Sequence, residues 1–303
     1  MSEILHPLYA ISGISGSGKT TLGKQLVTIF PEMKHIDQDQ YYLKKKPQVT
    51  LSDGKKAFNW DCLEALDPAF KEIIRKELTK SPVLLTGFAL CREVLPVVPK
   101  VHIHLVTANN PKDLELRCRE SRKKKVFNPN RDALVVRELV IPFYRKIVRN
   151  SDITDLLNVY TRYGTRVEID VLIQDVKLKY QHVNSGAHTM SVQPQYIAQI
   201  KEGKKVVEGR KMSRTLNCLG IRRGYLITMI HSSCEDVEVK VTYINYYLPS
   251  CGDPLAEYLT HETLERTLPG VTDLNEGRKV YLQYTTEEEI RELGMMAIGL
   301  EVI

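Results

Sequence analysis

The chain has 303 residues, a net charge of +6 and a hydrophobic content of 43%, which is typical of a globular protein with about two domains. It lacks the roughly 20 consecutive apolar residues that a membrane-spanning helix needs, and its first residues lack the features of a signal peptide. Its six cysteines form no C-x-x-C pair, which argues against zinc binding and against a secreted disulfide framework. We therefore expect a cytoplasmic protein with no membrane partner. The charge excess is too small to indicate nucleic-acid binding by itself.

A glycine-rich motif, Gly13–Thr20, follows the first apolar run and has the G-x-x-x-x-G-K-T spacing of a phosphate-binding loop. In such a loop backbone N–H groups surround phosphate oxygens, the lysine reaches the β- and γ-phosphates, and the threonine hydroxyl ligates Mg²⁺. Lys19 and Thr20 hold these two positions. The candidate nucleotide-binding residues are Gly13, Ser15, Gly16, Ser17, Gly18, Lys19, Thr20 and Thr21. The motif predicts that the first domain binds ATP or GTP with Mg²⁺.

Short apolar runs alternate with longer helical patterns through the first part of the chain. The expected strands are 8–12, 35–37, 83–87, 101–106 and 156–160, and the expected helices are 20–30, 63–78, 113–124 and 167–180. This alternation is typical of βαβ units and predicts an α/β domain, residues 1–181, with a parallel sheet flanked by helices on both faces. Residues 182–187 lose the periodicity and are the predicted linker.

The remainder, residues 188–303, has a different pattern and is predicted to be a smaller, β-rich α+β domain. Its clearest strand is 236–243, where valines alternate with polar residues and share one face. A strand over 189–192, helices over 193–202, 254–268 and 274–284, and a final strand over 295–303 complete the expected elements.

A phosphate-binding loop does not by itself separate kinases from other nucleotide-binding proteins, so other residues must decide. The second strand ends in Asp37-Gln38-Asp39-Gln40-Tyr41-Tyr42, and a carboxylate there can accept the proton of an attacking hydroxyl group. Asp39 is the candidate base. A basic helix over Arg117–Lys125 can close over the phosphates and neutralise transition-state charge.

With Phe58-Asn59-Trp60-Asp61, these motifs resemble those of P-loop kinases of the uridine kinase and nicotinamide riboside kinase group, over about residues 5–180. The resemblance implies an ATP-dependent phosphotransferase that acts on the 5′-hydroxyl of a nucleoside, with Asp61 on the ribose. The family also has an arginine-rich lid, an Arg-Asp pair and a segment like Val140–Tyr144. The residues implied are Asp39, Lys19 and Arg122 for catalysis and Asp37, Tyr41, Asp61, Arg117 and Arg131 for the substrate.

The chain departs from this group at one position, because Thr86 stands where the family has an acidic residue. Metal coordination then rests on Thr20, water and Asp37 or Asp39, or the catalytic rate has been lost. Two other readings stay open beside the nucleoside kinase. The acceptor can be the 5′-hydroxyl of an RNA end, or the chain can be an RNA-binding adaptor whose first domain switches with nucleotide and transfers nothing.

The second domain contains Gly203-Lys204-Lys205-Val206-Val207-Glu208-Gly209-Arg210 and resembles the ASCH domain, a PUA-like β-barrel with a G-x-K-x-x-E-x-R segment. Lys205, Glu208 and Arg210 can line one cleft for RNA or a nucleobase, since arginine stacks on bases and glutamate accepts from exocyclic amines. The alternative is a structural ion pair. Some ASCH proteins hydrolyse acylated cytidine with a Lys, a Thr and a Glu, and Glu208 occupies the place of that Thr.

Histidines and cysteines in two places suggest metal sites and are better explained otherwise. His102 and His104 share one face of a predicted strand without a third ligand, so ordinary packing explains them better than zinc does. Cys218, His231, Cys234 and Cys251 match no zinc spacing.

Overall fold

The computed structural model describes residues 5–108, 110–122, 133–158, 188–212, 221 and 223–303. The chain divides into two compact units, Met1–Gln181 and His182–Ile303, which are described separately. The predicted linker at 182–187 and the predicted helix at 167–180 lie outside the described residues. No described helix combines the length and the apolar character needed to cross a membrane.

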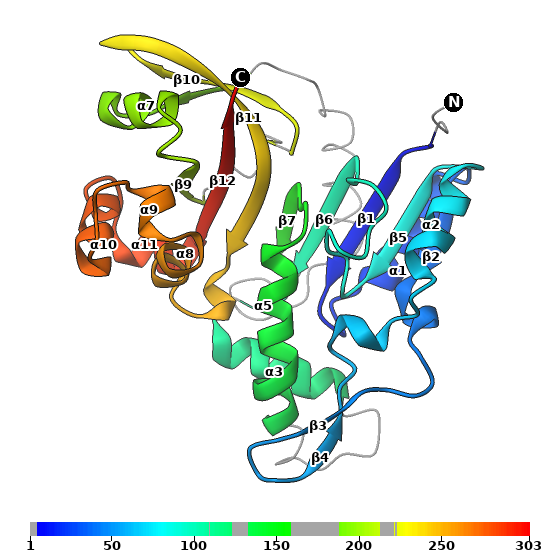
Figure 1. Cartoon of the computed structure of the whole chain (residues 1–303). Helices are drawn as coiled ribbons and strands as arrows, with labels where there is room; N and C mark the ends of the chain where they lie inside the picture. The colour runs from blue at the N-terminus through cyan, green and yellow to red at the C-terminus, as the bar shows by residue number, and fades with distance from the viewer. Residues whose placement is uncertain (1–4, 109, 123–132, 159–187, 213–220, 222) are drawn as a thin grey trace. The chain divides into compact units, whose positions relative to one another are not determined.

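The first unit is built on a five-stranded parallel sheet in the order β2-β5-β1-β6-β7 (Figure 1). Its strands are β1 (Leu8–Gly13), β2 (Lys34–Asp37), β5 (Val83–Gly87), β6 (Val101–Val106) and β7 (Asp155–Asn158). The central strands are buried along their whole length, as expected for a parallel sheet that helices cover on both faces. The expected fold class is confirmed. β5 is the direct neighbour of β1, and β2 lies at the edge of the sheet beyond β5.

Helices cover both faces of this sheet. The helices are α1 (Lys19–Ile29), α2 (Phe70–Leu78), α3 (Pro111–Arg122) and α5 (Ile141–Arg149). Phe70 of α2 packs with Leu8 and Ala10 of β1 in one apolar cluster. Gly23 of α1 lies against Thr86 of β5. Thr86 and its neighbour Leu85 point to opposite faces of the sheet, and Leu85 belongs to the cluster with Phe70. α1 therefore covers the other face.

The helix expected over 63–78 is shorter than predicted. Leu63–Ala65 form a single 3-10 turn, and α2 begins only at Phe70. The Asp67 side chain accepts a hydrogen bond from Ala69 N, and Pro68 disfavours helical geometry at the residue before it. A two-stranded hairpin, β3 (Gln48–Thr50) and β4 (Lys56–Phe58), and a π-helical turn at Val136–Val140 before α5 were not predicted.

The second unit contains a sheet in the order β8-β10-β11-β12-β9, antiparallel except for β8 and β10. The strands are β8 (His188–Ser191), β9 (Val207–Lys211), β10 (Leu226–His231), β11 (Cys234–Tyr247) and β12 (Met295–Val302). The alternation predicted for 236–243 is confirmed, because Val237, Val239 and Val241 of β11 are buried while Glu238 and Lys240 are exposed.

Besides α7 (Pro194–Lys201), this unit has helices α8 (Pro254–Glu262), α9 (Leu264–Thr267), α10 (Leu274–Leu282) and α11 (Glu287–Leu293), orange to red in Figure 1. The single helix expected over 254–268 is broken at Thr263, whose φ of 63° lies in the left-handed region. α11 was not predicted, although its capping box of Thr286 and Glu289 is visible in the sequence. These helices bury Leu255, Tyr258 and Ile290 against the sheet.

Candidate functional sites

The glycine-rich loop connects the end of β1 to the start of α1. Gly16 and Gly18 have φ values of 82° and 93°, a left-handed conformation that favours glycine. No side chain caps the N-terminus of α1. The buried Ser17 hydroxyl has no hydrogen-bond partner within the described part of the chain. A phosphate group supplies the oxygens that a buried hydroxyl and an uncapped helix N-terminus require, so the loop fits a polyphosphate.

Lys19 is the first residue of α1, and its side chain is almost fully buried beside the loop. Its ammonium group donates to Ile14 O at 3.4 Å. Burial lowers the pKa of Lys19, and the nearby carboxylates of Asp39 and Asp37 oppose this effect. The lysine of the loop and the two aspartates after β2 therefore belong to one electrostatic site, although they are about 20 residues apart in the chain.

A 3-10 turn, Gln38–Tyr41, directly follows β2 and presents the aspartates. Asp37 caps this turn by accepting a hydrogen bond from Asp39 N at 3.2 Å. Gln38 holds the turn against the backbone segment after β5, because its side chain donates to Ala89 O at 3.1 Å and accepts from Ala89 N at 2.8 Å. Sequence reasoning missed Gln38, whose fully buried amide pairs only with a backbone segment remote in sequence.

Tyr42 connects the candidate base to the candidate acceptor residue. Burial raises the pKa of Tyr42, and the charges of Asp39 and Asp61 raise it further, so both carboxylates act on this hydroxyl electrostatically. Asp61 itself is 8% exposed, and its backbone N–H donates to the Asn59 side chain. Tyr41, the tyrosine proposed for substrate binding, packs its ring against Phe70 of the core at 5.0 Å. The role of Tyr41 in substrate binding stays a prediction.

An aromatic surface lies beside Asp61. The Trp60 ring is 47% exposed and meets Tyr42 edge-on at 6.4 Å between centroids. The Lys46 ammonium lies 4.0 Å from the centroid of the Trp60 ring. An indole face attracts a cation, and Lys46 takes this place on Trp60. The exposed part of the Trp60 ring can stack with a planar group.

Thr86, the residue that replaces the family's acid, is fully buried at the end of β5. Its hydroxyl forms a hydrogen bond with His35 Nε2 at 3.0 Å. Burial lowers the pKa of His35. A neutral His–Thr pair therefore stands where the similar kinases have a carboxylate. Among the described residues, no three or more His, Cys, Asp or Glu side chains form a group that could hold a metal ion.

His102 and His104 form a buried polar network at the loop's base. Ser12 Oγ lies 2.7 Å from His102 Nε2 and 2.8 Å from His104 Nδ1, and His104 Nε2 lies 2.8 Å from the Tyr144 hydroxyl. Burial lowers the pKa of both histidines to about 3, so both are neutral at physiological pH. The network connects α5 to Ser12, the residue directly before the phosphate-binding loop.

The basic residues proposed for the lid are placed only in part. Arg117 and Arg122 belong to α3, but their side chains are outside the described part of the structure, as is the whole of Arg131. Their roles stay predictions.

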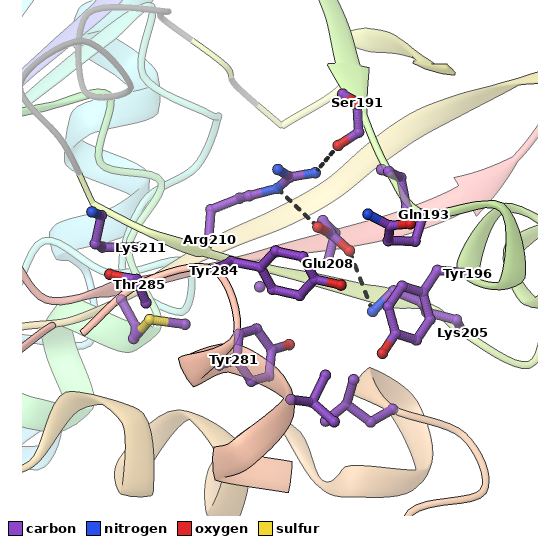
Figure 2. Close-up of a pocket in the computed structure, with 15 residues that line it drawn as sticks. Ser191, Gln193, Tyr196, Lys205, Glu208, Arg210, Lys211, Tyr281, Tyr284 and Thr285 are labelled. Atoms are coloured by element: carbon purple, nitrogen blue, oxygen red, sulfur yellow. Dashed lines mark hydrogen bonds and ion pairs between the residues drawn. The ribbon is translucent and has the colours of Figure 1, made fainter. Parts of the chain in front are cut away.

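The second unit contains a pocket of about 390 Å³ that brings the three residues of the G-x-K-x-x-E-x-R segment together (Figure 2). Glu208 lies between the two cations: its Oε1 is 2.8 Å from Arg210 Nε, and its Oε2 is 3.3 Å from Lys205 Nζ. Glu208 and Arg210 project from the same face of β9, since they are two residues apart on a strand. Arg210 also donates to Ser191 O at 2.6 Å.

Lys205 is 2% exposed, and its ammonium group is fully engaged. It donates to Val207 O and Thr267 O as well as pairing with Glu208. Burial lowers the pKa of Lys205, and the Glu208 carboxylate opposes this effect. With three hydrogen-bonding partners for three N–H groups, this lysine is a structural cation and not a free nucleophile.

Three tyrosines form the pocket's apolar wall. Tyr196 belongs to α7, Tyr281 to α10, and Tyr284 to the turn after α10. Tyr281 also pairs with Tyr258 through their hydroxyls at 2.7 Å. Both hydroxyls occupy the space that a Cβ at position 209 would need, which explains the glycine between Glu208 and Arg210. Sequence reasoning did not assign these tyrosines to the cleft, because they lie far from β9 along the chain.

A comparison with protein-family models decides the nature of the second unit, because residues 190–303 match the ASCH domain. These residues form an ASCH domain. Two solved structures are similar to it. The hypothetical protein PH0355 is 35% identical over 39% of this chain and 100% of its own length, with a TM-score of 0.34. PF0455 from Pyrococcus furiosus is 30% identical over 39% of this chain and 98% of its own, with a TM-score of 0.32.

The first unit resembles kinases. A segment of 60 residues is 40% identical to nicotinamide riboside kinase from Saccharomyces cerevisiae, covering 20% of this chain. The chain thus spans about a quarter of the length of this curated relative. A gluconokinase from Sinorhizobium meliloti 1021 is 16% identical over 58% of this chain and 98% of its own, with a TM-score of 0.31. The first unit is kinase-like in sequence. Its fold is a parallel sheet with helices on both faces.

Proposed function

We propose that the first unit is an ATP-dependent kinase that transfers a phosphoryl group to the 5′-hydroxyl of a nucleoside. The observation that carries the proposal is the convergence of Lys19, Asp39 and Asp61. The buried lysine interacts electrostatically with Asp39, and the charges of Asp39 and Asp61 both act on the Tyr42 hydroxyl. Donor and acceptor groups of a phosphoryl transfer need this proximity.

Each residue has a defined role in this proposal. Lys19 binds the phosphates, the loop's backbone surrounds them, and Thr20 with the phosphates would hold Mg²⁺, which supplies charge neutralisation when bound. Asp39 accepts the proton of the acceptor hydroxyl, and Asp61 orients the ribose. The exposed Trp60 ring beside Asp61 supports an acceptor that carries a planar ring.

The test is a phosphate-transfer assay of the full chain with ATP or GTP against uridine, cytidine, nicotinamide riboside and a 5′-hydroxyl oligoribonucleotide. Lys19→Ala gives the background. Asp39→Asn should keep nucleotide affinity and lose transfer by roughly 10²-fold or more, as expected for removal of a general base. Transfer only to the oligoribonucleotide would make the chain a kinase of RNA ends. Nucleotide binding without any transfer would make it a nucleotide-switched adaptor and contradict the proposal.

For the second unit we propose binding of RNA or a nucleobase in the pocket of β9. The three tyrosines support it, since exposed bases stack on aromatic side chains, and Arg210 can contact phosphate. Single-stranded RNA should bind in a salt-sensitive way, with about one counterion released for each phosphate contacted. Arg210→Ala should weaken this binding. Unchanged affinity in Arg210→Ala would favour a structural ion pair.

A further inference from the structure

Glu208 is the only acidic residue among the described residues that line the ASCH pocket. Two cations, Lys205 and Arg210, each pair with one of its oxygens. A carboxylate paired in this way accepts hydrogen bonds and does not donate them. We propose that this pocket selects a nucleobase that carries an exocyclic amino group over the same base with an oxo group. The inference deepens the proposed nucleobase binding and rests on it.

The position of Glu208 supports this selectivity. Its side chain is 10% exposed and forms the polar centre of the pocket, with Tyr196 on one side and Tyr281 and Tyr284 on the other (Figure 2). A base stacked on a tyrosine directs its polar edge along the ring plane. An amino group at that edge donates to Glu208, whereas an oxo group would place two acceptors against each other.

The size and the charge of the pocket indicate one nucleotide and not a longer strand. A volume of about 390 Å³ is at the lower end of small-molecule sites. Arg210 keeps N–H groups beyond those that contact Glu208 and Ser191. Lys211, which pairs with Glu289 at 3.0 Å, also lines the pocket. The remaining Arg210 N–H groups suit the phosphate of a nucleotide. Free nucleotides and a base within RNA share this chemistry, and the experiment separates them.

The proposal concerns binding without hydrolysis. Lys205 uses its three N–H groups on Val207 O, Thr267 O and Glu208, which leaves no lone pair for attack on an acyl group. Lys205 acts by holding the Glu208 carboxylate in position.

The experiment uses the full chain with Lys19→Ala and Asp61→Ala, so that the kinase unit's donor and acceptor sites do not contribute. Isothermal titration calorimetry compares CMP with UMP, which differ at C4 of the base (amino or oxo group) and at the neighbouring N3, which carries a proton only in UMP. CMP should bind at least roughly tenfold more tightly than UMP, the effect of one good base contact. AMP should likewise bind more tightly than IMP. Short cytidine and uridine oligoribonucleotides form the second arm and show whether the base is taken from RNA.

Glu208→Gln on the same background tests the residue itself. A glutamine amide both donates and accepts, so the CMP-to-UMP ratio should fall toward one. Glu301→Gln, an exposed glutamate at the end of β12, is the matched control and should leave the ratio unchanged. Equal binding of CMP and UMP to the unsubstituted pocket would overturn the selectivity and leave the proposed nucleobase binding intact. Absence of binding by all mononucleotides and oligonucleotides would overturn both.

Discussion

Glu262 at the end of α8 offers a direct test of the second unit's polar core. Its carboxylate is 1% exposed and accepts hydrogen bonds from Tyr243 and Tyr247 hydroxyls at 2.6 Å and from Asn245 Nδ2 at 2.7 Å. Burial by itself raises the pKa of Glu262, but the hydrogen bonds from His261 and these three residues together lower it to about 2.

The magnitude follows from linkage between ionisation and folding. The difference between the ordinary pKa of 4.5 and about 2 corresponds, at about 1.4 kcal/mol per pH unit, to about 3 kcal/mol of stability. Glu262→Gln removes the charge and turns an NH₂ group toward donors, so we expect a loss of about 3 kcal/mol at pH 7. Because the folded pKa is below the unfolded one, this contribution is complete above about pH 4.5 and is lost as the pH falls toward 2.

Urea unfolding of the full chain measures the effect with two signals. The chain has a single tryptophan, Trp60, which lies in the first unit, so its fluorescence monitors that unit and should not change. Far-ultraviolet circular dichroism should show an earlier transition of the second unit. Glu301→Gln should leave both signals unchanged. A loss below about 1 kcal/mol at pH 7, or a loss that stays constant between pH 7 and 3, would refute the reasoning.

Two further substitutions test the ASCH pocket and the histidine network. Lys205→Met should destabilise the second unit by about 3–5 kcal/mol in the same assay, because Glu208 loses a buried partner, and adding Glu208→Leu should recover much of this. If Lys205→Met left the free energy of unfolding of the second unit unchanged, the stabilising role given to the Lys205–Glu208 ion pair would be wrong. Tyr144→Phe removes the hydroxyl bound to His104 and should raise KM for ATP severalfold in steady-state kinetics, whereas Tyr9→Phe in β1 should not. Equal KM values in both variants would exclude a role for the network in nucleotide binding.

The sequence by itself determines the features that consecutive residues encode. The phosphate-binding loop is one contiguous segment, so its glycines and Lys19 are recognisable without any knowledge of packing. The valine alternation of β11 is equally local, because side chains alternate between the two faces of a strand. The predicted roles of Arg122 and Arg131 remain predictions, because the described structure does not place their side chains.

Tertiary structure alone decided which remote residues meet. Tyr281 reaches the pocket of Glu208 because its hydroxyl lies against Gly209 of β9, and nothing in either segment specifies that neighbour. Tyr41, the last residue of the 3-10 turn after β2, packs against Phe70 of the core, whereas the charges of Asp39 and Asp61 act on Tyr42. Propensity and periodicity act over a few residues, whereas the pairing of these side chains depends on how whole elements bury their apolar faces. The sequence therefore specified the functional groups of each segment, and packing determined which of these side chains lie in the same site.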